Sequence, residues 1–304
     1  MTNDVTRLPT PILRLFLAAF PAALWLAPPV PAQVFSFTRE RMIQYTAQNP
    51  FERFPDGRPK VPDELLEKVK GLVIEEAYGL VRQKGFPNQY EGNWKVLQPE
   101  KKLVGRAFTV QFMPARADVA EAMQKEADAK GLGRLRNQTA IDMLQPADVV
   151  VVDLFGKTES GTFVGDKLAY YIWKAAGTGL VVDGAIFWLS RIWETGMPAY
   201  YRGTHPSSLG DVMLTGLNVP IRVGEATVMP GDVVLGDREG VFFIPPHLVK
   251  DVVAAAELTQ IRDEWIKKKF DTGKYKSGEI YGRPRDPALI KEYEEYLKSR
   301  QRKP

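Results

Sequence analysis

The hydrophobic and polar positions of this chain follow helical spacing in some segments and strand-like runs in others. Residues 62–85 repeat apolar positions at helical spacing, which predicts one continuous helix. We expect Asp63 to cap this helix and Gly85 to end it. Its apolar stripe consists of Leu65, Leu66, Val69, Leu72 and Val73.

Two uninterrupted apolar runs, "ADVVVVDLFG" at 147–156 and "LVVDGA" at 180–185, predict strands that are buried on both faces. A loop rich in Gly and Thr connects them, followed by a helix that begins at Asp166 and ends near Gly177. Such a strand-helix-strand unit predicts that part of the sheet is parallel. Further segments are predicted as strands at 102–114 and 198–203 and as helical pieces at 118–131 and 137–145.

The pattern changes after residue 220, where short strands alternate with the turns "MPGD" and "DREG". This arrangement is typical of antiparallel hairpins. A long helix is predicted from Pro245 and a shorter one at 288–300. The chain is therefore expected to form one mixed α/β domain with a C-terminal helical extension, residues 251–304, that straps across its own domain or a neighbouring subunit.

The first 32 residues resemble a secretory signal peptide. Arg7 and Arg14 precede an apolar run at 15–27 that is shorter than the roughly 20 residues needed to span a membrane. Small residues then allow cleavage after Ala32. We expect a periplasmic or secreted protein with no membrane association after cleavage, and residues 33–61, which lack periodicity, are expected to form an arm over the surface.

Composition excludes several classes of function. The chain of 304 residues is 44% hydrophobic, has 41 basic and 37 acidic residues, and contains no cysteine. This mild excess of basic residues favours a mixed solvated surface over a nucleic-acid partner. Without cysteine there is no disulfide, thiolate nucleophile or cysteine metal site. Common hydrolase and phosphate-loop motifs are absent, and of the two histidines His205 is a better functional candidate than His247, although a structural role is favoured for both.

The segment "GTFVGDKLA" offers a possible anion site. A helix that begins at Asp166 leaves its first backbone N–H groups unpaired, and these can bind a carboxylate or a phosphate. The alternative is that Asp166 is the N-cap and satisfies these donors itself. The residues alone slightly favour the cap.

Together, "KLVGRAFTV", "PADVVVVD", "GTFVGDKLA", "GTGLVVDGA", "GMPAYYRG" and "MPGDVVLGDREGVFFIP" resemble the RraA-like family over residues 62–250. This family contains the regulator of ribonuclease activity A and metal-dependent 4-hydroxy-4-methyl-2-oxoglutarate aldolases that also decarboxylate oxaloacetate. The resemblance implies a swivelling β/β/α fold, a homotrimer or hexamer with sites between subunits, a Mg²⁺ or Mn²⁺ cofactor and a small 2-oxo acid substrate. It also implies that the substrate carboxylate binds the backbone of Gly165, Asp166, Lys167 and Leu168.

The chain departs from the family where the motif V-D-G-A-V-R-D is expected. Phe187 stands in place of the arginine that binds the keto acid, and Trp188 in place of the aspartate that holds the metal. Neither side chain can ligate Mg²⁺ or pair with a carboxylate. We expect Arg191, one helical turn beyond Phe187, to contact the anion instead. The metal ligands stay unassigned; the candidate oxygen donors are Asp153, Asp166, Glu194, and Asp237 or Glu239 of a neighbouring subunit.

Two functional hypotheses follow. The first is an exported lyase that acts on a small 2-oxo acid. The second is a non-catalytic trimeric protein that binds a small carboxylate or an aromatic acid between Phe187, Trp188 and Trp193. Ribonuclease regulation requires the cytoplasm, and the predicted signal peptide argues against it.

Overall fold

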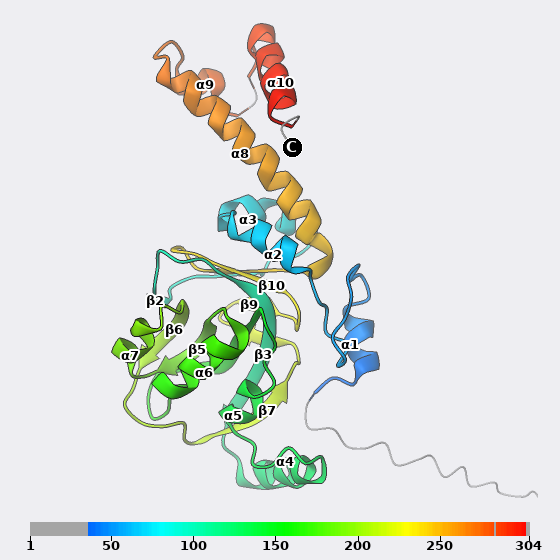
Figure 1. Cartoon of the computed structure of the whole chain (residues 1–304), viewed down its shortest axis with the longest axis vertical. Helices are drawn as coiled ribbons and strands as arrows, with labels where there is room; N and C mark the ends of the chain where they lie inside the picture. The colour runs from blue at the N-terminus through cyan, green and yellow to red at the C-terminus, as the bar shows by residue number, and fades with distance from the viewer. Residues whose placement is uncertain (1–35, 283, 302–304) are drawn as a thin grey trace, which may run out of the picture. The chain divides into compact units, whose positions relative to one another are not determined.

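A nine-stranded sheet that mixes parallel and antiparallel pairs forms the centre of the fold (Figure 1). The computed structural model describes residues 36–282 and 284–301, so the predicted signal peptide lies outside the described residues. The strand order is β1-β11-β10-β3-β4-β5-β6-β2, with β7 also paired to β3 and a separate pair formed by β8 and β9. The strands are β1 (Tyr90–Glu91), β2 (Lys95–Leu97), β3 (Leu103–Pro114), β4 (Asp148–Lys157), β5 (Leu180–Ile186), β6 (Ala199–Thr204), β7 (Val212–Leu217), β8 (Ile221–Val223), β9 (Ala226–Val228), β10 (Val233–Gly236) and β11 (Val241–Ile244).

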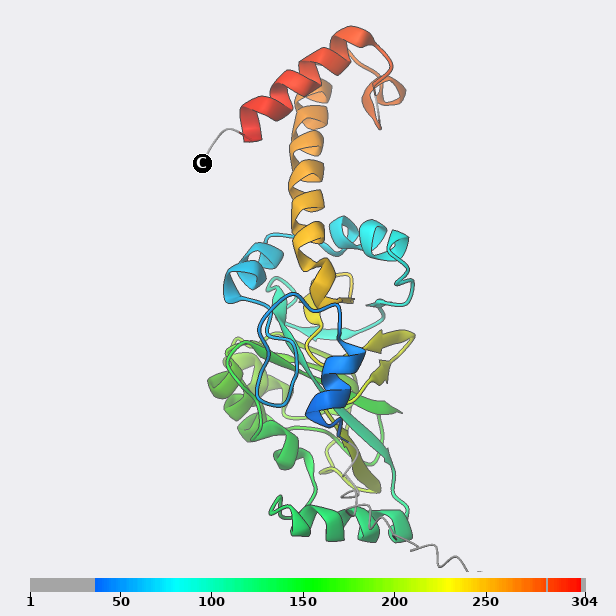
Figure 2. The same ribbon diagram turned by 90° about the vertical axis from the view of Figure 1, so that its right-hand side faces the viewer.

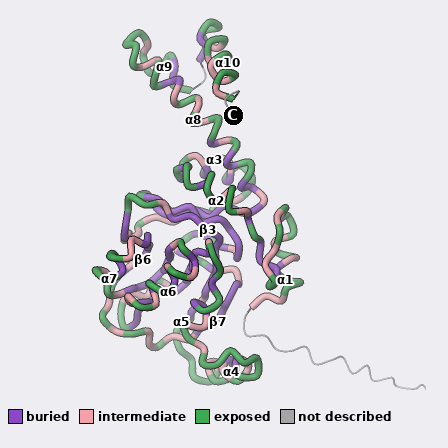
Figure 3. Tube along the Cα trace, in the orientation of Figure 1, coloured by how far each residue is buried: buried purple, intermediate pink, exposed green. Residues whose placement is uncertain are grey.

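The two apolar runs form the middle of this sheet. β4 pairs in parallel with β3 and β5, and β5 pairs in parallel with β6, which confirms the predicted parallel unit. Along β4, Val150 and Val152 pack in the core that includes helix α6 (Asp166–Ala176), whereas Val149 and Val151 pack in the core that includes β8 and β9. The strand is thus buried on both faces, as predicted, and Figure 3 shows buried residues following the strands.

The segment predicted as one helix from residue 62 to 85 forms two helices, so the prediction of a continuous helix was wrong. α2 (Asp63–Lys70) ends at Gly71, and α3 (Ile74–Gln83) begins after Val73, whose backbone is extended. Asp63 is the first helical residue rather than the cap, because Pro62 occupies the cap position. The break turns the chain so that both helices pack, with α8 (Val249–Asp271), over β10 and β11.

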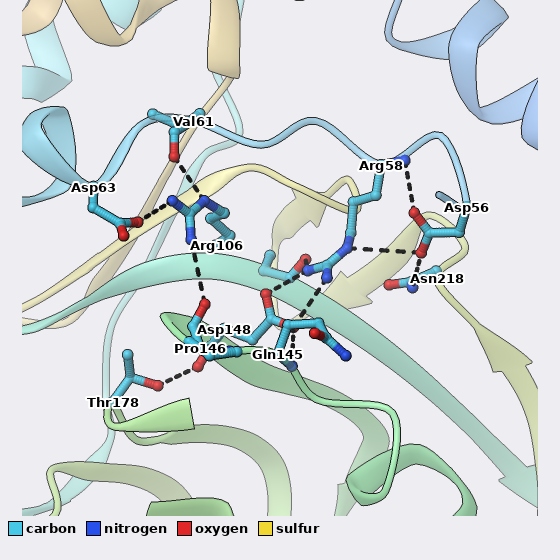
Figure 4. A network of polar contacts seen from close by, with 11 residues as sticks. Asp56, Arg58, Val61, Asp63, Arg106, Gln145, Pro146, Asp148, Thr178 and Asn218 are labelled. Atoms are coloured by element: carbon cyan, nitrogen blue, oxygen red, sulfur yellow. Dashed lines mark hydrogen bonds and ion pairs between the residues drawn. The ribbon is translucent and has the colours of Figure 1, made fainter. Parts of the chain in front are cut away.

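The segment predicted as an arm contains α1 (Arg39–Tyr45) and continues into a polar network beneath it (Figure 4). Arg58 donates two hydrogen bonds to Asp148, of 2.6 and 2.9 Å, and the two side chains are 1% and 0% exposed. Arg106 donates to the carbonyl of Val61 and pairs with Asp63. The segment therefore inserts a charged side chain beside the start of β4 and is fixed there at two points.

The C-terminal extension builds a small core of its own. α10 (Pro287–Gln301) packs against the distal part of α8, and α9 (Ser277–Ile280) closes the end of the pair (Figures 1 and 2). Trp265, Ile266, Ile280 and Leu289 are buried there. The predicted C-terminal helices are confirmed. Within residues 36–282 and 284–301, no helix is long and apolar enough to cross a bilayer.

The remaining helices lie around the sheet. α4 (Ala117–Ala129) and α5 (Asn137–Ile141) follow β3, and the short α7 (Leu189–Glu194) follows β5. α4 buries only Met123 and Ala127, so most of its surface is exposed (Figure 3).

Candidate functional site

A cavity of about 590 Å³ lies at the start of α6. The loop before α6, the end of β5, the approach to α5 and the start of β7 form its walls. The six residues predicted to bind the substrate all line it: Gly165, Asp166, Lys167, Leu168, Phe187 and Trp188. Segments 19 positions apart in sequence, 165–168 and 187–188, therefore meet at one cavity, although the binding role of these residues stays a prediction.

The N-terminus of α6 presents backbone donors to this cavity. Gly165 is the N-cap and makes no side-chain capping bond, and the Gly165 carbonyl accepts from the N–H of Ala169 at 3.0 Å. Asp166 is the first helical residue, so the reading of Asp166 as the cap was wrong. Within the described residues, the N–H groups of Asp166, Lys167 and Leu168 have no hydrogen-bond acceptor. They are free to bind an anion.

Two aromatic rings pack directly beside these donors. A Cβ placed on Gly165 would lie 2.7 Å from Cε1 of Phe187 and 3.2 Å from Cδ1 of Trp188, so both rings contact the glycine face. The backbone N–H of Phe187 donates to the carbonyl of Val164 at 3.1 Å and fixes the end of β5 to the loop before α6. Phe187 and Trp188 meet edge to face, with ring centroids 6.2 Å apart. The cavity thus combines backbone donors with an aromatic wall.

Trp188 has an unusual backbone conformation. Its φ of 63° and ψ of 38° are left-handed, and it is the N-cap residue of α7. For L-residues other than asparagine and aspartate, this conformation costs about 1–2 kcal/mol, whereas glycine adopts it freely. The aspartate that the family resemblance implies here would tolerate it better. The indole is 55% exposed, so burial of the ring does not offset this cost.

Arg191 lies on α7 but does not line the cavity of the single chain. Its guanidinium forms an exposed ion pair with Glu194 at 3.4 Å, on the solvent face of the helix. Trp193 is 49% exposed and also lies outside the lining. The catalytic role of Arg191 stays a prediction, and the structure gives it no contact with the anion donors of α6.

The cavity has basic side chains that sequence reasoning missed. Arg134 and Arg136 line it together with Lys167, and the acidic side chain in the lining is Asp166. None of the three cations forms an ion pair with any residue that the structure describes. The run "GRLRNQ" between two predicted helices was the available signal, but only the fold shows that it reaches α6. The surplus of positive charge favours an anionic ligand.

The comparisons with known proteins agree with this architecture. The RraA-like family model, described as Aldolase/RraA, matches residues 67–243. This chain belongs to the RraA-like family. The structure of Streptomyces coelicolor RraAS2, described as an unusual member of the RNase ES inhibitor RraA protein family, is similar with a TM-score of 0.59 and 28% identity. That match covers 72% of this chain and 99% of RraAS2, so the predicted RraA-like fold is confirmed.

Two curated proteins are similar to this chain over part of their length. Protein DlpA from Legionella pneumophila is 26% identical over 180 residues, which is 59% of this chain and 27% of DlpA. The "Putative 4-hydroxy-4-methyl-2-oxoglutarate aldolase" from Halalkalibacterium halodurans is 32% identical over 119 residues, which is 39% of this chain and 56% of that protein. The chain thus spans about a quarter of one relative and about half of the other.

The residues at the RraA-like metal position do not fit Mg²⁺ or Mn²⁺. Phe187 and Trp188 offer no oxygen ligand, and the described residues contain no group of three His, Asp or Glu side chains that could share an ion. Asp183 is already held by Arg202 at 2.7 Å and by the N–H of Gly224 at 3.2 Å. Within the described residues of the single chain, the side chains at this position therefore supply no ligand set for Mg²⁺ or Mn²⁺.

Of the candidate oxygen donors, Asp166 lines the cavity, whereas Asp153, Asp237 and Glu239 do not. Asp153, beside Asp183 in the sheet, accepts from the N–H of Phe155, and burial raises the pKa of the Asp153 carboxyl. Asp237 accepts from Lys102 and from the N–H of Ile74. A shared hydrogen bond with Glu75 raises the pKa of Glu239. None of these three carboxylates lines the cavity of the described chain.

Neither histidine belongs to this cavity. His205 Nδ1 lies 2.8 Å from Oγ of Ser207 within the loop after β6. His247 lies against the ring of Phe86, with centroids 5.5 Å apart, and burial lowers the pKa of its imidazole. The structural roles favoured for both from sequence stay predictions.

Proposed function

We propose that this RraA-like protein binds a small carboxylic acid that carries a flat apolar group, with the cavity at the start of α6 as its site. The observation that carries the proposal is the contact of Phe187 and Trp188 with Gly165, directly beside three unpaired backbone N–H groups. The donors suit a carboxylate, and the rings suit the flat group attached to it.

Charge supports the same ligand class. Arg134, Arg136 and Lys167 surround the cavity, and Asp166 is the single acidic side chain in its lining. Because the three basic side chains are exposed, we expect them to attract and orient the anion and to add little to its binding free energy. The backbone donors and the rings then supply the specific contacts.

A titration with three ligands tests this proposal. Phenylpyruvate combines the carboxylate with a ring, pyruvate lacks the ring, and benzyl alcohol lacks the charge. We expect phenylpyruvate to change tryptophan fluorescence most strongly, and Trp188→Ala to weaken its binding by about tenfold, as loss of an aromatic contact in a small site would. The matched control is Trp193→Ala, which removes an exposed indole outside the cavity. Equal binding by both variants and the wild type would exclude this site.

A second candidate is a lyase that acts on small 2-oxo acids, favoured by the family match and by the relatives named as aldolases. In this reading, oxygen ligands for a divalent ion come from a neighbouring subunit, and the carboxylate binds at α6 as above. Oxaloacetate and 4-hydroxy-4-methyl-2-oxoglutarate, each with Mg²⁺ or Mn²⁺, provide the assay. Absence of metal-dependent pyruvate release removes this candidate and leaves the binding proposal intact.

The double substitution Phe187→Arg and Trp188→Asp restores the residue types that the family resemblance implies. We expect a partial gain of metal-dependent activity at best, because the rings pack on Gly165 and charged replacements would leave space there. Full activity would show that these two residues alone suppress the reaction.

We further propose that the protein is exported and assembles as a homotrimer or hexamer, with no nucleic-acid partner. The predicted signal peptide supports export, and the family resemblance supports the assembly. Cell fractionation tests the first, with recovery in the cytoplasm as the contrary result. Light scattering of the purified protein tests the second, and a monomer at micromolar concentration would contradict it.

A further inference from the structure

A second cavity of about 400 Å³ lies between the N-terminal segment and the sheet, away from the site described above. One wall is the end of α1 and the turn that follows it, residues 44–49. The other wall is built from residues near β9, the turn before β10, and Pro245 to His247. Figure 2 shows α1 in dark blue in front of the strands that form this second wall.

Asp232 is a buried carboxyl without a cationic partner in this wall. It is 2% exposed, and its Oδ2 accepts from the N–H of Met229 at 2.8 Å. The described residues donate no hydrogen bond to Oδ1, and the side chain lines the cavity. A buried carboxyl normally has a partner for each oxygen, so one acceptor is left for a ligand.

Gln89 adds a second acceptor. Its amide nitrogen donates to the carbonyls of Thr227 at 3.2 Å and Phe243 at 3.0 Å, which fixes the orientation of the amide. The opposite atom, Oε1, accepts no hydrogen bond from a described residue. Gln89 is 7% exposed and lines the same cavity. Two nearly buried side chains therefore offer acceptors and no donors.

The rest of the lining is neutral. It contains no Lys or Arg, and its titratable side chains besides Asp232 are Tyr45 and His247. Burial lowers the pKa of His247, so its imidazole is neutral at physiological pH and does not repel a cation. Flat or apolar side chains make up part of the walls: Tyr45, Phe86, Met229, Pro245 and Pro246. Neutral polar side chains make up much of the rest: Gln44, Thr46, Gln48, Asn49 and Thr227.

We propose that this cavity is a second ligand site and that it takes a small primary amine attached to a flat apolar group. An ammonium has three donors and one positive charge, which match the acceptors of Asp232 and Gln89. The ring of such a ligand fits between Tyr45 and Phe86. The two cavities are thus opposite in charge preference, since basic side chains surround the first and a lone carboxyl marks the second.

The ionisation of Asp232 determines how the affinity for an amine should change with pH. Burial raises the pKa of this carboxyl to about 7, with the hydrogen bond from Met229 acting in the opposite direction. An amine binds the carboxylate better than the neutral acid. Its affinity should therefore increase between about pH 6 and pH 8, where Asp232 loses its proton.

Calorimetry with benzylamine, benzyl alcohol and benzoate tests the charge preference directly. We expect saturable binding of benzylamine with one equivalent per chain, weaker binding of benzyl alcohol and no competition by benzoate. Asp232→Asn keeps an acceptor for the N–H of Met229 and removes the charge, and should weaken benzylamine binding by about tenfold or more. Tyr45→Ala removes an exposed ring and should weaken benzylamine binding severalfold. This second variant keeps the test available if Asp232→Asn does not fold.

Trp188→Ala distinguishes the two cavities, because Trp188 lines the first and not the second. We expect it to leave benzylamine binding unchanged, whether or not the carboxylate proposal holds. Three results would overturn the amine site. They are no saturable binding by the wild type, wild-type affinity for benzylamine in both Asp232→Asn and Tyr45→Ala, or loss of benzylamine binding in Trp188→Ala.

Discussion

Removal of the Arg58 charge should destabilise the protein strongly, although Arg58 lies in a segment that sequence reasoning placed on the surface. We consider Arg58→Met, which keeps an aliphatic chain of similar reach and deletes the guanidinium. Asp148, which is 0% exposed, would then lose its ion-pair partner and two hydrogen bonds, of 2.6 and 2.9 Å. The N–H of Gln145, at 2.9 Å from Oδ2, would be its main remaining side-chain contact (Figure 4).

Removal of one partner from a buried pair costs about 3–5 kcal/mol, because the other charge is left without compensation in the interior. The guanidinium also lies 4.3 Å from the ring centroid of Phe54, and the substitution removes that contact as well. We therefore expect the free energy of unfolding to fall by about 4 kcal/mol. Against a typical total of about 5–15 kcal/mol, this is a large share of the stability.

Urea denaturation monitored by tryptophan fluorescence measures this loss. The matched control is Arg116→Met, since the pair between Arg116 and Asp118 has the same ion-pair chemistry at 2.9 Å but is exposed. We expect that control to lose at most about 1 kcal/mol. The double variant Arg58→Met, Asp148→Asn removes both charges and should be more stable than Arg58→Met alone.

Two results would refute this reasoning. A loss in Arg58→Met no larger than in Arg116→Met would show that the pair of Arg58 and Asp148 contributes little to stability. A double variant whose loss equals the sum of the two single losses would show that the charges are not coupled.

Three further substitutions test other parts of the structure. Burial raises the pKa of Asp232 from 3.8 to about 7, so the folded protein retains a proton that the unfolded chain releases. The free energy of unfolding should therefore fall by about 3 kcal/mol as pH rises from about 4 to about 7. Asp232→Asn should remove this part of the slope in urea titrations, and unchanged slopes would contradict it. Gly165→Ala places a Cβ 2.7 Å from the Phe187 ring, so it should lower the free energy of unfolding by about 1–3 kcal/mol and weaken ligand binding. The control Gly210→Ala, whose Cβ would have its nearest atom at 3.9 Å, should leave the melting temperature almost unchanged. Trp188→Gly should be more stable than Trp188→Ala by about 1 kcal/mol, because both remove the indole and only glycine adopts the left-handed conformation without strain. Equal melting temperatures would indicate that the backbone relaxes to another conformation.

Much of the sheet was predictable from local patterns. The valine run of β4 and the run "LVVDGA" of β5 are continuous and apolar, and only a strand covered on both faces suits such a sequence. The turn "DREG" likewise predicted the antiparallel pairing of β10 and β11. The hairpin expected at "MPGD" was wrong, because this turn joins β9 to β10, and these strands pair with β8 and with β3 and β11 instead. Positions where two local tendencies compete were predicted less well: apolar spacing continues through Gly71 to Val73, but the chain turns there to place α3 over β11.

The site was predictable in its parts but not in its arrangement. The glycine before Asp166 and the aromatic pair after β5 were visible as motifs, and the structure places both at one cavity. Arg134 and Arg136 were missed because their segment has no motif and reaches α6 only through the fold. Asp166 was read as a cap from residue type, whereas the cap position belongs to Gly165.

The sequence by itself determined the family, the buried strands and the replacement of the arginine and aspartate at Phe187 and Trp188, because these follow from residue identity and spacing. The tertiary structure alone decided what surrounds them. It placed the rings against Gly165, turned Arg191 toward Glu194, buried Arg58 against Asp148 and left Asp232 unpaired beside a second cavity. Such contacts join segments distant in sequence, and their energies depend on burial and distance, which local patterns do not encode.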